Sequence, residues 1–69
     1  MAHELGIVGA GNMAEAIVRS VIAAGAIRKE GIVAADVSPA RREVFAKQIG
    51  VKAVERNDEA VRGARMVLL

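Results

Sequence analysis

The chain has 69 residues, of which 54% are apolar, with no cysteine and a single aromatic residue, Phe45. A chain of this length allows one small domain and buries only about 60% of its unfolded surface. The net charge of +2 argues against a disordered chain and is too small to indicate a nucleic-acid partner. The longest apolar-or-glycine stretch, residues 21–27, is far shorter than the roughly 20 residues that cross a bilayer, and the acidic N-terminus does not resemble a signal peptide. We therefore expect a cytoplasmic protein with no membrane or nucleic-acid partner.

The first half of the chain predicts a strand, a helix and a second strand. Residues 5–8 form a short apolar run that ends at Gly9, which is typical of a buried strand. From residue 11 to residue 24 the apolar residues recur at steps of three and four, which indicates an amphipathic helix that ends at Gly25. A second apolar run at 32–35 predicts the next strand. The expected buried face of the helix consists of Met13, Ile17, Val21 and Ala24, with the adjoining row Ala14, Val18 and Ile22.

A second helix is predicted after the second strand. Ser38 followed by Pro39 is the pattern of an N-cap with proline at the first helical position, and Gly50 marks the end of this helix. Its apolar residues form one stripe and its basic residues are expected to face solvent. The stripe is Val44, Phe45 and Ile49, and the basic residues are Arg41, Arg42 and Lys47.

The last third predicts two short strands around a brief helix. A third strand covers residues 51–54, Asn57 caps a helix that runs through Val61, and a fourth strand at 66–69 follows Gly63. Strands that alternate with helices across short turns predict an α/β fold, a Rossmann-like parallel sheet with flanking helices and right-handed crossovers. Apolar runs on successive residues predict strands covered on both faces. The sequence stops inside the fourth strand, so we expect a piece of a larger protein, truncated after about four strands.

One motif carries chemistry. Residues 9–14, Gly-Ala-Gly-Asn-Met-Ala, match G-x-G-x-x-A at the point where a predicted strand ends and a helix begins. The motif alone is weak evidence, but Asp36 closes the next strand 22 positions after Ala14. This layout is the one that a dinucleotide-binding βαβ unit requires, with an acidic residue about 20 positions downstream.

Each small residue of the motif has a physical reason. Gly9 allows the tight turn out of the strand, Gly11 lets the backbone approach a diphosphate, and Ala14 lets the helix pack close to the strand. The amides from Gly11 to Met13 lie at a helix N-terminus, which favours a phosphate. The alternative is a glycine-rich turn that only lets a helix pack on a strand.

The choice of nucleotide stays open. Asp36 can accept hydrogen bonds from the adenine ribose hydroxyls, which favours NAD and repels a 2′-phosphate. Ser38, Arg41 and Arg42 follow closely and could hold the 2′-phosphate of NADP. Their structural alternatives are an N-cap for Ser38 and a solvated helix face for the two arginines.

The remaining candidate residues indicate little chemistry. His3 is expected to lie in a solvated tail, and Met13 and Met66 are expected to be core residues. Asn57 is first a helix cap, and it also lies at the carboxyl edge of the sheet, where a cofactor binds. We find no convincing catalytic residue and no metal-ligand cluster in the sequence.

The motif region goes beyond a generic fingerprint. Residues 7–17, which include Gly-Ala-Gly-Asn-Met-Ala followed by an apolar helix, resemble the N-terminus of pyrroline-5-carboxylate reductases. Residues 35–39, the pair at 50–51 and Asn57 also resemble that family. The resemblance covers essentially all 69 residues, which correspond to roughly the first quarter of such an enzyme, and the Asn12-Met13 pair is its most discriminating element.

The resemblance implies a reductase that passes hydride from NAD(P)H to the imine carbon of 1-pyrroline-5-carboxylate and gives L-proline. Residues 1–69 would form part of the N-terminal NAD(P)-binding domain, and the helical C-terminal domain that dimerises and builds the substrate pocket is absent. Several NADP-using relatives carry serine or asparagine where this chain has Asp36. The implied cofactor-binding residues are Val8, Gly9, Ala10, Gly11, Asn12, Met13, Asp36, Ser38 and Asn57.

Three other functions are compatible with some of these features. Another NAD(P)-dependent dehydrogenase of the β-hydroxyacid type would share this first domain, although such enzymes usually carry glycine at the position of Ala14. A nucleotide-binding module without chemistry is a second alternative. A nucleic-acid-binding basic helix is disfavoured, because Glu43 interrupts the basic residues and no aromatic residue accompanies them as a stacking platform.

Overall fold

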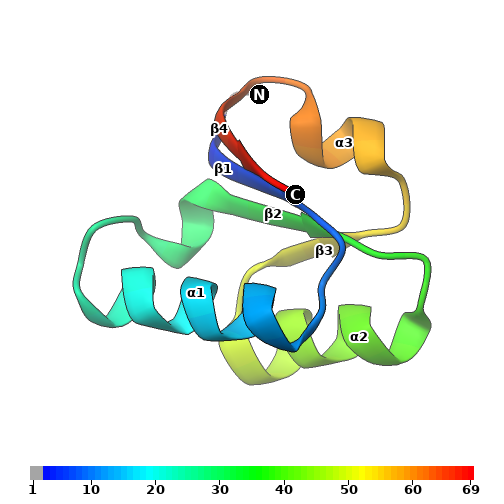
Figure 1. Cartoon of the computed structure of the whole chain (residues 1–69), viewed down its shortest axis with the longest axis horizontal. Coiled ribbons are helices and arrows are strands. Elements are labelled where there is room, and N and C mark those ends of the chain that lie inside the picture. The colour runs from blue at the N-terminus through cyan, green and yellow to red at the C-terminus, as the bar shows by residue number, and fades with distance from the viewer. Residues whose placement is uncertain (1–2) are drawn as a thin grey trace.

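Four parallel strands form one sheet in the order β3-β2-β1-β4 in the computed structural model, which describes residues 3–69 (Figure 1). Strands β1 and β2 pair with Leu5 opposite Ile32, and β1 pairs with β4 with Leu5 opposite Met66. The predicted α/β fold with a Rossmann-like parallel sheet is confirmed. The elements are β1 (His3–Val8), α1 (Asn12–Ala23), a 3₁₀ turn (Lys29–Gly31), β2 (Ile32–Ala35), α2 (Pro39–Glu43), a π-helical turn (Val44–Ile49), β3 (Lys52–Val54), α3 (Asn57–Val61) and β4 (Ala64–Leu68).

Helices cover both faces of the sheet, with α1 and α2 on one side and α3 on the other (Figure 1). The chain moves outward from β1 to β2 and β3, and then returns past both strands to place β4 on the far side of β1. Because strand–helix–strand connections are right-handed, the reversal of direction moves the connecting helix to the opposite face. Because all four strands are parallel, their carboxyl ends lie at the same edge of the sheet. The direction in which strands are added reverses at β1, between β2 and β4.

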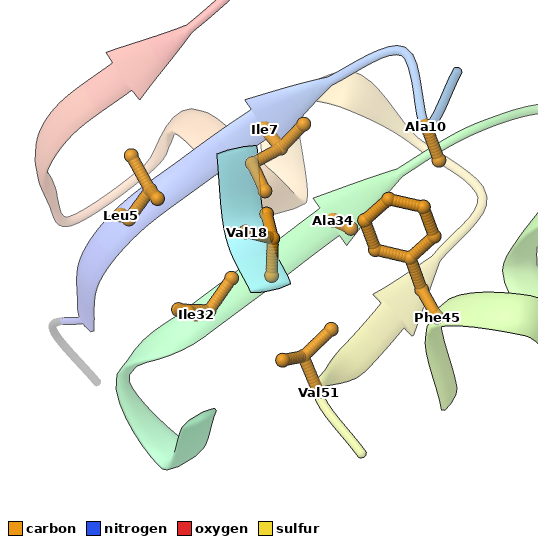
Figure 2. Close-up of a cluster of buried hydrophobic side chains, with 8 residues drawn as sticks. All are labelled: Leu5, Ile7, Ala10, Val18, Ile32, Ala34, Phe45 and Val51. Atoms are coloured by element: carbon orange, nitrogen blue, oxygen red, sulfur yellow. The ribbon is translucent and has the colours of Figure 1, made fainter. Parts of the chain in front are cut away.

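The main core lies between the sheet and the α1–α2 layer (Figure 2). Ile7, Val18, Ile32 and Phe45 are its largest completely buried side chains. Alternate residues of β2 serve the two faces, since successive side chains of a strand point to opposite sides. A smaller cluster under α3 therefore contains Val33, Ala35 and Ala60.

The predicted end of α1 and the predicted start of α2 are confirmed. After α1, Gly25 has a φ of 73°, and the N–H groups of Gly25 and Ala26 donate to the carbonyls of Ile22 and Val21. This pair of bonds is a Schellman motif, which requires a left-handed residue. At the start of α2, the Ser38 hydroxyl accepts a hydrogen bond from the Arg41 N–H at 3.4 Å, with Pro39 at the first helical position.

The helix after Ser38 ends at Gly50 as predicted, but it is not α-helical throughout. Residues 44–49 form a π-helical turn, and the N–H groups of Gly50 and Val51 both donate to the Phe45 carbonyl. The predicted cap role of Asn57 is wrong. Arg56 occupies the cap position of α3, its side chain makes no capping hydrogen bond to the helix backbone, and Asn57 is the first helical residue.

Two methionines that we expected in the core are exposed. Met13 at the start of α1 is 78% exposed and Met66 in β4 is 52% exposed. Val18, from the adjoining row, is the residue of α1 that is completely buried, so the buried face is rotated from the predicted one. Strand β4 lies at the edge of the sheet with most of its residues exposed, which explains why the prediction of cover on both faces fails there.

His3 is part of the sheet rather than of a solvated tail. His3 begins β1, two residues earlier than predicted, and its ring Nε2 lies 2.6 Å from the Ala60 carbonyl of α3. A carbonyl oxygen only accepts, so Nε2 carries the proton in this bond. Within residues 3–69, no helix has the length and apolar character needed to span a membrane.

Candidate functional site

The turn between β1 and α1 leaves open space beside its two motif glycines. Gly9 has a φ of 91°, a conformation that favours glycine, and its N–H donates to the Ala35 carbonyl at 2.8 Å. Gly11 has ordinary extended backbone and occupies the N-cap of α1. A β-carbon built on either glycine would meet nothing within 4 Å. Packing therefore does not require glycine at position 11. The physical role of Gly11 is to keep the backbone of the turn accessible.

The first turn of α1 presents N–H groups at this opening. The first bond of the helix runs from the Glu15 N–H to the Gly11 carbonyl at 2.9 Å. The N–H groups of Asn12, Met13 and Ala14 precede that bond and have no carbonyl one turn back within the helix. Together with the positive end of the helix dipole they form a local environment suited to a phosphate group.

A hollow of about 300 Å³ adjoins the same turn at the carboxyl edge of the sheet. Residues from the glycine turn, α1 and the end of β4 line it. Sequence reasoning missed the contribution of β4, because nothing local in that strand indicates that it lies beside α1. The lining residues are Gly9, Gly11, Asn12, Met13, Ala14, Ile17, Leu68 and Leu69.

Asp36, which directly follows β2, links the turn between β1 and α1 to the turn between β2 and α2. Its Oδ1 accepts from the Ser38 N–H and its Oδ2 accepts from the Ala10 N–H, each at 2.8 Å. These backbone donors, that of Ser38 first and that of Ala10 second, lower the pKa of Asp36 below its ordinary value. The structure thus places Asp36 directly beside the glycine turn, in agreement with the spacing argument, and Ser38 is hydrogen-bonded to Asp36.

This lowered pKa predicts an acid-sensitive fold. A carboxyl group whose pKa is lowered in the folded state stabilises that state at pH values above its ordinary pKa. This contribution is lost as the pH falls through the lowered pKa of the folded state. Asp36→Asn should therefore be less stable than the wild type at pH 7, and the difference should shrink below about pH 4. Urea unfolding of both proteins between pH 3 and pH 7 measures this. Parallel profiles would contradict the role of the Asp36 charge.

The two arginines after Ser38 do not form a solvated helix face. Arg42 Nη1 donates to the Asp36 carbonyl at 2.9 Å and to the Val37 carbonyl at 3.1 Å. Arg41 reaches further, to the β1–α1 segment, where its Nε donates to the Ala10 carbonyl at 2.6 Å. That expectation was wrong for both residues, because each finds carbonyl oxygens within reach. Lys47 is 76% exposed, as predicted.

Asn57 stands apart from the other candidates. It follows β3 at the carboxyl edge, two strands away from β1, and is exposed. Among residues 3–69 no hydrogen bond joins it to the glycine turn or to Asp36. In the same part of the chain, no three His, Asp or Glu side chains gather closely enough to hold a metal ion.

A glycine turn that opens onto a helix N-terminus, with an acidic residue ending the neighbouring parallel strand, defines a dinucleotide-binding domain of the Rossmann type. Comparison with known sequences agrees with this class. The chain belongs to the family described as NADP oxidoreductase, coenzyme F420-dependent, whose model matches residues 4–69. It is also similar to the pyrroline-5-carboxylate reductase of Pisum sativum, with 36% identity over 66 residues that cover 96% of this chain. The resemblance noted from the sequence is confirmed.

The chain spans about a quarter of the length of that relative, 24%. The match therefore concerns an NAD(P)-binding portion of an oxidoreductase family.

Proposed function

We propose that this chain is the N-terminal NAD(P)-binding portion of a pyrroline-5-carboxylate reductase. The complete enzyme would transfer hydride from NADPH or NADH to 1-pyrroline-5-carboxylate and form L-proline, as the last step of proline biosynthesis. The open glycine turn at the N-terminus of α1 is the observation that carries the proposal. The likeness to the Pisum sativum enzyme supplies the reaction. A helical C-terminal domain would provide the substrate pocket and the contacts between identical subunits.

The residues present fit a dinucleotide. Its diphosphate would take the amides from Gly11 to Met13, where Gly11 presents no β-carbon and the helix dipole favours negative charge. Val8, Gly9 and Ala10 would shape that turn. The nicotinamide ring of the bound nucleotide supplies the hydride, and this chain contributes binding and orientation rather than acid–base groups.

The ribose end of the nucleotide would lie near Asp36. Each oxygen of this carboxylate accepts one backbone N–H, and a carboxylate oxygen has a second lone pair that a ribose hydroxyl could use. Ser38 is beside it, and Asn57 would contact the nucleotide from the end of β3. We propose NAD or NADP as the cofactor, with both choices compatible with this set of groups.

The decisive assay compares the complete protein with the 69-residue chain. The complete protein should oxidise NADPH or NADH only when 1-pyrroline-5-carboxylate is present and should form proline in equal amount. The 69-residue chain alone should give no proline, because it lacks the substrate pocket. Absence of turnover with this substrate in the complete protein, together with turnover of a β-hydroxyacid, would assign the chain to a different dehydrogenase.

A further inference from the structure

The peptide groups around Ala10 are held from both sides by the β2–α2 segment. The Ala10 N–H donates to Asp36 Oδ2 at 2.8 Å, and the Ala10 carbonyl accepts from Arg41 Nε at 2.6 Å. Ala10 itself is only 1% exposed. A turn that contains two glycines has a wide choice of conformations, so these two bonds restrain a segment that its own sequence leaves free.

Arg41 is itself held in place. Its Nη2 lies 2.9 Å from Glu15 Oε1, and its guanidinium carbon lies 5.9 Å from the centre of the buried Phe45 ring. The side chain is 28% exposed, compared with 46% for Arg19, the other partner of Glu15. The hydrogen bond from Arg41, and to a smaller degree the one from Arg19, lowers the pKa of Glu15. The lowered pKa favours the charged carboxylate, which is the form that pairs with Arg41.

The bond from Arg41 acts directly on a binding amide. The Ala10 carbonyl and the Gly11 N–H belong to the same peptide plane and, because the peptide is trans, point in opposite directions. Because Arg41 holds the Ala10 carbonyl oxygen, the Gly11 N–H points to the side of the peptide plane that faces away from Arg41. The direction of the first phosphate-binding donor is therefore set from a residue 31 positions along the chain.

We propose that Arg41 is a positioning residue that orients the glycine turn for the diphosphate of the nucleotide. This inference rests on the proposed function. It assigns Arg41 a role in the affinity for any dinucleotide, with or without a 2′-phosphate. The competing role, direct contact with the 2′-phosphate of NADP, would instead make Arg41 a determinant of the choice between NADP and NAD.

Two ligands and two sets of variants separate these roles. The ligands are ADP-ribose and 2′-phospho-ADP-ribose, with their Kd values measured by calorimetry on the complete protein. Arg41→Gln should weaken both ligands by a similar factor, roughly tenfold for the loss of one charged hydrogen bond. Arg19→Gln is the matched control, because it removes an arginine from the same Glu15 without touching Ala10, and it should bind both ligands as the wild type does.

Arg41→Lys tests geometry against charge. Lysine keeps the positive charge but lacks the planar fork that reaches Ala10 and Glu15 together, so its affinity for both ligands should also fall. Wild-type affinity in Arg41→Lys would overturn the positioning role, since charge alone would then suffice. Thermal unfolding of each variant shows whether it is folded.

Loss confined to 2′-phospho-ADP-ribose would overturn the proposal in favour of direct contact with that phosphate. A lower Tm with unchanged affinity for both ligands would reduce Arg41 to a structural residue. Failure of the wild type to bind either ligand would overturn the proposed function itself, and that result does not depend on any Arg41 variant.

Discussion

Gly11→Val is expected to abolish NADPH binding while leaving the fold intact. Gly11 has extended backbone with a φ of −82°, which valine adopts readily, and a β-carbon there meets no atom within 4 Å. The valine side chain would instead occupy the space in front of the first-turn amides. Loss of two charged hydrogen bonds at about 1.5–3 kcal/mol each raises Kd by roughly two orders of magnitude or more. Fluorescence titration of the complete protein with NADPH measures this.

Gly9→Ala is the matched comparison for that experiment. Gly9 also has open space around it, but its φ of 91° strains any residue with a β-carbon. We therefore expect Gly9→Ala to lower stability, and Gly11→Val to keep the wild-type circular dichroism and unfolding midpoint. Wild-type NADPH affinity in a folded Gly11→Val protein would contradict the assignment of this turn to the diphosphate.

Those elements whose signals are local could be predicted from the sequence. Residues 32–35 form a strand with the predicted limits, and the Ser38 cap and the Gly50 stop lie where their residue types indicate. Propensity, capping and apolar period each depend on neighbours within a few positions. The position of Asp36 beside the glycine turn followed from spacing, since the carboxyl ends of paired parallel strands share one edge.

Features that depend on distant partners could not be predicted. The bond between His3 and Ala60 joins residues 57 positions apart, and the bond between Arg41 and Ala10 joins residues 31 apart. A basic residue on a helix looks the same in sequence whether it faces solvent or a buried carbonyl. Exposure of Met66 depends in the same way on its place in an edge strand, which no local pattern records.

Gly6→Ala should be strongly destabilising, because the added methyl group meets backbone atoms of α3. Gly6 lies inside β1, in agreement with the strand predicted at residues 5–8, and helix α3 packs against this strand. A β-carbon at Gly6 would overlap the Ala60 carbonyl oxygen and lie 2.8 Å from the carbonyl carbon. Both are backbone atoms, so α3 must move away from the sheet. The cost is about 1–3 kcal/mol or more in the free energy of unfolding.

The same displacement should propagate to other contacts of Ala60. The Ala60 carbonyl oxygen accepts a hydrogen bond from the His3 ring Nε2 at 2.6 Å. The Ala60 side chain is completely buried in a cluster with Val33 and Ala35. Urea unfolding of the complete protein measures the loss, and hydrogen exchange should show it first in α3 and β4. Gly11→Ala is the matched control, because the added methyl group meets nothing, and its stability should stay close to that of the wild type, since the entropic gain of alanine is offset by its weaker preference for the N-cap. Equal unfolding midpoints for Gly6→Ala and Gly11→Ala would mean that α3 does not pack against β1 through Ala60.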